Sequence, residues 1–342
     1  MSAAVLVLYT GGTIGMTATD RGLTPTPGLR ARIEQQFGAS LAELPSFELL
    51  ELEPLIDSAN ITPAHWQRLA ALLAEHWEHY QGFVILHGTD TMAYSAGALA
   101  FMLGACQKNV LFTGAQVPLG LPGSDAADNL RQALTLAVGP RIPDVSLVFN
   151  DRLLRGSRIR KVSSKRFAAF DSPNEAPLGN LTNTATLHHQ RMLSADAASR
   201  APQLAAQLNF QPGAVALLTL HPCMPSALYD ALLADPKCRA VVLQSYGAGN
   251  IPSRDQAFNA FLCRARARNK VLVNISQCLD GGVSPGTYAA SASLQEQGVL
   301  NGGDMTPEAA FCKLHWLIAG GRDQATVRED WAELYCAERS PD

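Results

Sequence analysis

The chain has 342 residues, of which 47% are hydrophobic, and carries a formal net charge of −3 at pH 7. This composition supplies a large core, and the length favours two domains over one. A slightly acidic chain gives no reason to expect a nucleic-acid partner. No apolar run approaches the roughly 18 residues that a membrane-spanning helix needs, and residues 1–4 include neither a basic segment nor a cleavage site. We therefore expect a cytoplasmic protein without a membrane segment or a secretory signal.

The cysteines form no C-x-x-C pair, which is typical of reduced thiols in a cytoplasmic protein. We interpret each of them as a small core residue, and we expect no metal site. The seven are Cys106, Cys223, Cys238, Cys263, Cys278, Cys312 and Cys336.

In the first half of the chain, apolar runs alternate with amphipathic segments, as in a sheet that is covered by helices. The runs at 4–9 and 83–86 are apolar throughout, which is typical of buried parallel strands. This α/β pattern predicts a larger N-terminal domain, residues 1–185, with a doubly wound sheet of the flavodoxin or Rossmann type. The expected strands lie at 4–9, 47–52, 82–86, 109–113 and 145–150, and the expected helices at 63–80, 92–103 and 124–138.

The segment 186–213 is polar and alanine-rich, has no strong period, and is interrupted by Pro202 and Gly213. We interpret it as an interdomain connection. A second series of strands and helices follows, which predicts a smaller C-terminal α/β domain with a parallel sheet, residues 214–342. Its expected strands lie at 214–220, 240–243 and 271–275, and a closing helix at 307–319.

The turn Thr-Gly-Gly-Thr-Ile-Gly at 10–15 follows the first expected strand. A dinucleotide-binding loop would need G-x-G-x-x-G at the start of a helix, but position 10 is threonine and prolines soon follow. No lysine of the phosphate-loop type follows the glycines either. The glycines instead allow a tight turn that lifts Thr13 into the crevice beyond the strand ends. The next segment, 16–30, has few apolar anchors and is a candidate for a mobile lid.

A second turn, His-Gly-Thr-Asp-Thr at 87–91, follows another buried strand. The two turns are expected at one edge of the sheet, so the hydroxyls of Thr13 and Thr89 are expected to face one crevice. The free amides at the start of the next helix can receive an anion such as a carboxylate. Two plainer alternatives remain: Asp90 or Thr91 is only a helix cap, and His87 is only a satisfied near-core histidine.

A threonine hydroxyl is a poor nucleophile until a base removes its proton. A lysine can serve where burial or neighbouring cations lower its pKa, and a carboxylate can orient it. The run Arg-Gly-Ser-Arg-Ile-Arg-Lys at 155–161 supplies such a lysine. We interpret most of its arginines as a solvated basic face, and single out Lys161 by analogy with a known family.

Residues 9–16 and 83–94 resemble the two signature segments of the L-asparaginases, most closely those of the bacterial type I, cytoplasmic branch. Two long signatures at the correct spacing are a much stronger signal than either glycine turn alone. The likeness covers nearly the whole chain in the right order. It extends to Asp-Ser at 57–58, Thr-Gly-Ala-Gln at 113–116, Arg-Gly-Ser-Arg at 155–158 with Lys161, Ser-Tyr-Gly-Ala-Gly-Asn at 245–250, and Gly-Asp-Met-Thr at 303–306.

The resemblance implies hydrolysis of L-asparagine to L-aspartate and ammonia, with no metal or organic cofactor. Thr13 would attack the side-chain amide carbonyl and form an acyl-enzyme, which water then cleaves; direct attack by water stays open. Thr89, Asp90 and Lys161 would form a relay that moves protons or activates water. The backbone amide of Thr89 and its neighbours would form the oxyanion site.

The resemblance also implies how the substrate is held. Asp57, Ser58 and Asp90, with Thr89, would bind its α-amino and α-carboxylate groups. The family builds its active sites at subunit contacts, so we expect a homodimer or homotetramer in which Asn250 reaches into a neighbour's site.

Three positions depart from the family pattern. Leu23 aligns with a lid tyrosine that helps to activate the first threonine, and leucine cannot exchange a proton. Gln244 occupies the place of an arginine that precedes Ser-Tyr-Gly and belongs to an allosteric asparagine site. Cys278 matches a cysteine of that site, so a pocket is expected while its response to asparagine is in question. Arg160 replaces a small polar residue.

Leu23 also motivates a second hypothesis, a non-catalytic amino-acid-binding or regulatory protein on the same scaffold. A glutaminase-asparaginase is a third hypothesis. A deamidating subunit of a tRNA amidotransferase ranks below asparaginase, because the chain is not basic and has no added N-terminal domain for tRNA. A nicotinamide-dependent dehydrogenase ranks last.

Overall fold

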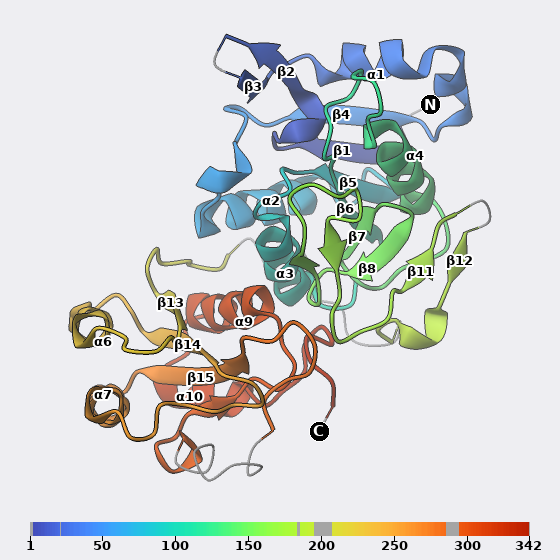
Figure 1. The fold of residues 1–342 in the computed structure, drawn as a ribbon. Coiled ribbons are helices and arrows are strands. Elements are labelled where there is room, and N and C mark those ends of the chain that lie inside the picture. Colours follow the sequence, from blue (N-terminus) through green and yellow to red (C-terminus); the bar gives the residue numbers. More distant parts are fainter. Residues whose placement is uncertain (1–2, 21, 183–184, 195–206, 285–293, 342) are drawn as a thin grey trace. The chain divides into compact units, whose positions relative to one another are not determined.

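The computed structural model describes residues 3–20, 22–182, 185–194, 207–284 and 294–341. The chain divides into two compact units, Met1–Gln207 and Leu208–Asp342 (Figure 1). Each unit has its own sheet, eight-stranded in the first and four-stranded in the second. This confirms the predicted α/β class, with a larger N-terminal and a smaller C-terminal sheet. In the part of the chain that the structure describes, no helix is long and apolar enough to cross a membrane.

The first sheet has the strand order β12-β11-β8-β7-β6-β5-β1-β4. Its strands from β4 to β7 are all parallel and, numbered by their order in the chain, run 2-1-3-4-5, which is the flavodoxin-like order. The other three pair antiparallel at one side. The strands are β1 Val5–Tyr9, β4 Phe47–Glu51, β5 Gly82–Leu86, β6 Asn109–Thr113, β7 Ser146–Phe149, β8 Arg152–Arg155, β11 Gly179–Asn180 and β12 Thr186–Leu187.

The carboxyl ends of four neighbouring strands are level with one another. Tyr9 at the end of β1 pairs with Glu51 of β4 on one side and with Leu86 of β5 on the other. Leu86 in turn pairs with Thr113 of β6. The turns after these strands therefore begin at the same edge of the sheet. The strand order reverses between β1 and β5, and ligands of such folds bind at this point.

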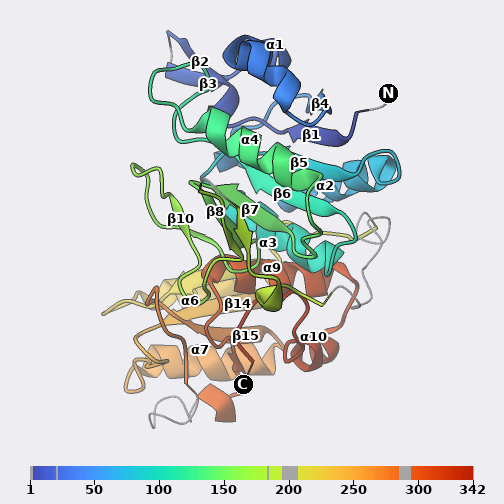
Figure 2. The ribbon, with the colours of Figure 1, turned by 90° about the vertical axis from the view of Figure 1, so that its right-hand side faces the viewer.

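Helices cover both faces of this sheet (Figure 2). Helices α1 and α4 share one core with Val7 and Val84. Helix α2 lies on the opposite face, where Trp77 at its end stacks on Phe83, and α3 packs against α2. The crossovers β5–α3–β6 and β6–α4–β7 run in the same direction across the sheet but pass over opposite faces. One of the two is therefore left-handed, although nearly all such crossovers are right-handed. The helices are α1 Leu29–Phe37, α2 Pro63–His76, α3 Met92–Leu103 and α4 Ala126–Ala137.

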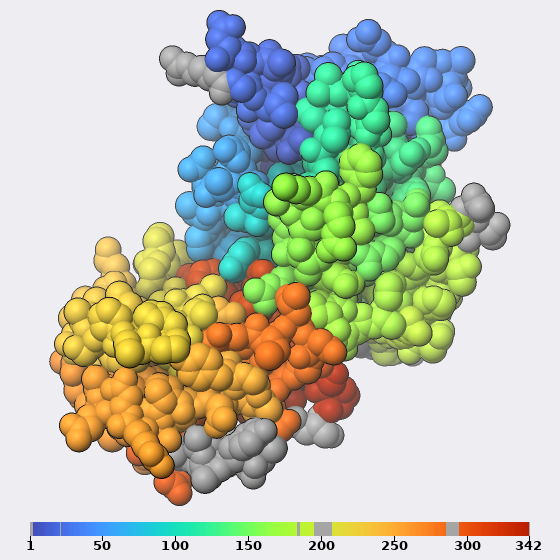
Figure 3. Space-filling model, viewed as in Figure 1, coloured from blue at the N-terminus to red at the C-terminus, as the bar shows by residue number. Residues whose placement is uncertain are grey.

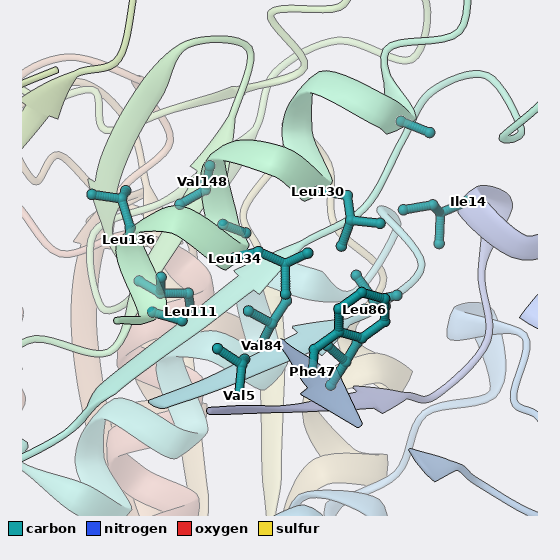
Figure 4. Close-up of a cluster of buried hydrophobic side chains, with 14 of the residues drawn as sticks. Val5, Ile14, Phe47, Val84, Leu86, Leu111, Leu130, Leu134, Leu136 and Val148 are labelled. Atoms are coloured by element: carbon teal, nitrogen blue, oxygen red, sulfur yellow. The ribbon is translucent and has the colours of Figure 1, made fainter. Parts of the chain in front are cut away.

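The core beneath α4 consists of close-packed aliphatic side chains. Figure 4 shows Leu130 and Leu134 of α4 directed at Val84 and Leu86 of β5. All four are completely buried. Each such side chain contributes about 1.5–3 kcal/mol on burial, so this layer holds β5 firmly beneath the turn that follows it.

A short antiparallel hairpin follows the first turn. It comprises β2 Met16–Thr19 and β3 Gly22–Pro25, with Thr17 opposite Thr24 and Ala18 opposite Leu23. The segment 16–30, the candidate for a mobile lid, therefore consists of this hairpin followed by the start of α1. Threonine is common in strands and supports this pairing.

The second unit contains four parallel strands in chain order and helices on both faces. Helices α6 and α7 share an apolar core with β14, whereas α9 and α10 pack together against β13, β14 and β15. The elements are β13 Val215–Thr219, α6 Ser226–Ala234, β14 Ala240–Ser245, α7 Gln256–Ala267, β15 Val271–Ser276, β16 Leu300–Asn301, α9 Pro307–Ala319 and α10 Gln324–Asp330.

The structure modifies two interpretations made from the sequence. The expected connection, 186–213, begins with strand β12 and a short 3-10 helix, His189–Arg191, that belong to the first unit; its residues 195–206 lie outside the described residues. The interpretation of every cysteine as a core residue is wrong for three of them, which are exposed: Cys223, Cys263 and Cys278.

Candidate active site

Three turns at the carboxyl edge of the first sheet touch one another through glycines. An added Cβ on Gly12 would lie 2.4 Å from the Cα and N of Gly88. A Cβ on Gly88 would lie 2.5 Å from Oγ of Ser58. Only glycine allows such close backbone approach. These contacts bring together the turns that carry Thr13, Ser58 and Thr89.

The backbone of the first turn is one that side chains disfavour. Gly11 has a φ of +126° and Gly12 a φ of +90°. The turn is tied down by the backbone, since Thr10 N donates to Leu86 O at 3.0 Å and Ile56 N donates to Thr10 O at 2.7 Å. Thr13 follows at the start of a 3-10 helix, Thr13–Gly15, and is partly exposed. The turn thus presents Thr13 on a rigid base.

Lys161 joins the second turn to a distant strand. Its Nζ donates to Oγ1 of Thr89 and to Oδ1 of Asp90, both at 2.7 Å. Thr89 is buried, the side chain of Lys161 is about one-fifth exposed and that of Asp90 is mostly exposed. Lys161 lies on the short strand β9, Arg160–Lys161, which pairs with β10, Phe170–Asp171. The hydroxyl, amine and carboxylate named from the sequence are therefore in direct contact.

The alternative that Asp90 or Thr91 only caps α3 is not supported. Thr91 is the N-cap residue, but its side chain makes no capping hydrogen bond. Its Oγ1 instead donates to the carbonyl of Ser58 at 2.7 Å, while Asp90 contacts Lys161. Thr91 thus ties the second turn to the Asp57-Ser58 turn, a role that sequence reasoning missed.

The plainer alternative for His87 is confirmed. It is buried, with Nδ1 2.7 Å from Gly88 O and Nε2 2.9 Å from Oγ of Ser95. Trp66 Nε1 donates to the same Oγ at 3.1 Å. A carbonyl only accepts, so Nδ1 bears the proton and Ser95 donates to Nε2. Burial lowers the pKa of His87 to about 4, so the ring is neutral.

The interpretation of the 155–161 arginines as a solvated face is wrong for Arg155 and Arg158, which are both buried. Arg155 forms ion pairs with Asp144 and with Glu175. Burial raises the pKa of both carboxyl groups, against the opposing charge of Arg155. Arg158 donates to the carbonyl of Asn174. Buried cations need such partners, and these contacts hold the segment that leads to Lys161.

Asp57 and Ser58 follow β4 in a single 3-10 turn, Ser58–Asn60. The side chain of Asp57 is exposed and accepts from Ala59 N at 3.2 Å. Ser58 is buried against Gly88. Leu23 lies on the hairpin that follows Thr13 and is 48% exposed.

The remaining candidate residues belong to the second unit. Asn250 is exposed at the end of a tight turn in which Tyr246 and Asn250 exchange backbone hydrogen bonds. Gln244 is buried in β14 and accepts from Oγ1 of Thr219 at 2.7 Å. Cys278 is exposed just beyond β15, and its N–H donates to Oγ of Ser276 at 2.9 Å.

Comparison with known proteins matches both units. Residues 4–193 match the family model "Asparaginase, N-terminal", and residues 214–329 match "Glutaminase/Asparaginase C-terminal domain". L-asparaginase 1 of Escherichia coli (strain K12) is 39% identical over 99% of this chain and 98% of that protein. A 60 kDa lysophospholipase of Homo sapiens is 38% identical over 95% of this chain, which spans 59% of that longer protein. The crystal structure of L-asparaginase I from Vibrio cholerae superposes with a TM-score of 0.87 at 34% identity, covering 100% of both chains.

The chain matches both α/β domains in this order over nearly its full length. A hydroxyl, an amine and a carboxylate are in contact near the strand ends. Together these features define an amidohydrolase. Within that class, the chain belongs to the asparaginase family.

Proposed function

We propose that this protein is a cytoplasmic L-asparaginase that works as a homodimer or homotetramer. The observation that carries the proposal is the hydrogen-bonded set Thr89, Lys161 and Asp90, on a turn that contacts the turn of Thr13. The similarity to L-asparaginase 1 over nearly the full length of both proteins supports the same substrate.

In the first half of the proposed reaction, Oγ1 of Thr13 attacks the side-chain amide carbon of L-asparagine. The hydroxyl proton passes to the departing nitrogen, the C–N bond breaks and ammonia leaves. The backbone amide of Thr89 and its neighbours stabilise the negative charge on the carbonyl oxygen. The product of this half-reaction is an ester between Thr13 and the aspartyl group.

In the second half, water attacks the ester carbon and L-aspartate leaves as Thr13 regains its proton. Lys161 and Thr89 move the proton that the attacking water loses, and the carboxylate of Asp90 orients the amine. Asp90 also binds the α-amino group of the substrate, together with the Asp57-Ser58 turn and Asn250.

Ammonia release from purified protein tests this proposal. We expect release from L-asparagine and loss of at least about 100-fold in kcat for Thr13→Ala and Thr89→Val, with unchanged circular dichroism. Full activity in either variant would overturn the role of that threonine. Parallel assays with L-glutamine define the substrate preference.

Leu23 keeps a second candidate open, an amino-acid-binding protein without turnover. It is favoured only by the missing lid tyrosine. Calorimetry distinguishes the two: binding of L-aspartate or L-asparagine, with no ammonia released at any pH, would replace the enzyme by the binding protein.

A further inference from the structure

The hairpin β2–β3 begins directly after the 3-10 helix that Thr13 opens, so the position of its ends bears on that of Thr13. Its near end is Gly15, the last residue of the 3-10 helix that Thr13 opens. Its far end is the segment Thr26-Pro27, before α1. The hairpin can hold Thr13 in a fixed place only if these two ends are themselves fixed.

Arg32 of α1 contacts both ends. Its NH2 donates to Gly15 O at 3.1 Å and to Thr26 O at 2.9 Å. Its NH1 donates to Pro27 O at 2.8 Å. One guanidinium group therefore joins the backbone on either side of the hairpin, and its planar fork suits several acceptors at once.

The chemistry of these contacts differs from that of the arginine two residues earlier. Arg30 pairs with the carboxylate of Glu34, one turn away on the same helix, and its NH1 donates to Phe47 O of β4 and not to the hairpin. For Arg32, the residues that the structure describes include no carboxylate oxygen within 4.0 Å, and its Nε is buried without a partner. Hydrogen bonds from a charged donor to neutral carbonyls are stronger than neutral ones, so Arg32 is held by the hairpin ends.

Besides a direct hydrogen bond between its two ends, from Thr26 N to Gly15 O at 3.3 Å, the hairpin faces open space on the side of α1. An open cavity of about 390 Å³ lies between β2, the α1 side chains of Arg32, Gln35 and Gln36, and the loop at 119–121. In Figure 3 the surface of the hairpin (dark blue) and that of the loop (green) lie side by side at the top of the first unit. Because apolar packing does not fill this space, hydrogen bonds at the hairpin ends carry a larger share of its positioning.

We propose that Arg32 is the positioning residue of the first catalytic turn: through the carbonyls of Gly15, Thr26 and Pro27 it clamps the hairpin and thereby fixes Thr13. This inference rests on the proposed role of Thr13. A displacement of a nucleophile by about 1 Å can cost about 100-fold in rate, so the clamp should act on kcat.

The test compares Arg32→Met, Arg32→Lys and the matched control Arg30→Met on the same helix. We expect Arg32→Met to lower kcat for asparagine at least about tenfold with KM changed less than about threefold. Arg32→Lys should recover part of the loss, because an ammonium group reaches one or two of the carbonyls. Arg30→Met should keep kcat within about twofold.

Trypsin provides a second readout that does not depend on activity. Within 13–27 the sequence offers trypsin only the bond after Arg21, and mass spectrometry identifies that cut. We expect Arg32→Met to speed this cleavage at least about fivefold in folded protein, because a protease cuts locally opened segments and a hairpin without fixed ends opens more often. If Arg32→Met does not fold, Arg32→Lys carries both measurements, with a smaller loss of kcat and faster cleavage expected.

Wild-type kcat and wild-type cleavage rates in the Arg32 variants would overturn the proposal. If the wild-type protein releases no ammonia, the proposed function is wrong. The cleavage rate then still tests whether Arg32 clamps the hairpin. A loss of kcat equal in Arg30→Met and Arg32→Met would assign the effect to α1 as a whole and would also overturn the proposal.

Discussion

Leu23 lies in an exposed place on the hairpin, at the position that the sequence resemblance aligns with a lid tyrosine. Its side chain is 48% exposed, so a larger side chain fits without displacing the core. We predict that Leu23→Tyr raises kcat for asparagine about tenfold or more, because a phenol can take part in proton transfer to and from Thr13.

The control for this prediction is Leu23→Phe, which adds the ring without the hydroxyl group. It should leave kcat within about twofold of the wild type. An equal gain in both variants would show that ring packing, and not proton transfer, limits the wild-type enzyme.

His87 gives the first unit a defined sensitivity to acid. The unfolded chain binds a proton near the usual pKa of 6.5, whereas burial keeps the folded pKa at about 4. The contribution of His87 to stability is therefore fully present above pH 6.5 and declines as the pH falls toward 4. Between pH 7 and pH 5 the loss amounts to about 2 kcal/mol.

We predict that His87→Gln reduces the change in unfolding free energy between pH 7 and pH 5 by about 2 kcal/mol. Urea denaturation at both pH values measures it. A variant with the wild-type difference would show that His87 does not titrate as its burial implies. Lower stability of the variant at pH 7 alone would not affect this comparison.

At the scale of elements, the contact between the two threonine turns depends on Gly12. Its φ of +90° and its distance from Gly88 both exclude a side chain. We predict that Gly12→Ala lowers kcat at least about 100-fold, since a shift of about 1 Å between Thr13 and Thr89 has such an effect.

Gly120 offers a matched control for this change. Its φ is +89°, but an added Cβ there would meet nothing within 4 Å. Gly120→Ala should therefore show the cost of the backbone conformation alone, about 1–2 kcal/mol, with kcat near the wild-type value. Similar losses of kcat in the two variants would contradict the importance of the contact with Gly88.

The sequence predicted the regular elements of the parallel sheet well, because buried strands and amphipathic helices have strong patterns. β5, β6, α3 and α9 have the bounds expected from it. The hairpin β2–β3 was missed because a threonine-rich segment with glycine and proline has no clear period. The short antiparallel strands β8, β11 and β12 were missed because two to four residues carry too little pattern.

The candidate site was predictable only in part. The contact of Lys161 with Thr89 and Asp90 was expected from the family resemblance. The burial of Arg155 and Arg158 was not, because their carboxylate and carbonyl partners lie on other loops, 11 to 20 residues away.

At the scale of the whole molecule, the proposed oligomer makes a sharp prediction about Asn250. If it serves a neighbour's site, an inactive Thr13→Ala subunit can lend its intact Asn250 to an Asn250→Ala subunit with intact Thr13. We predict that the two inactive variants, refolded together, recover activity, because each mixed pair contains one complete site.

The control is a mixture of Thr13→Ala with Lys161→Met, two changes in the same unit. This mixture should stay inactive. Light scattering establishes that mixed oligomers form, and absence of recovery in the first mixture would place Asn250 outside the neighbour's site.

The contact between Lys161 and Thr89 spans 72 residues of sequence. Long-range contacts of this kind form late, after the chain has closed large loops. We expect the segment with Lys161 to reach Thr89 only after β7 and β8 have joined the sheet that contains β1, β4 and β5. The onset of ammonia production during refolding should consequently report that the sheet is complete. We expect it to begin only after helical content has reached its final value.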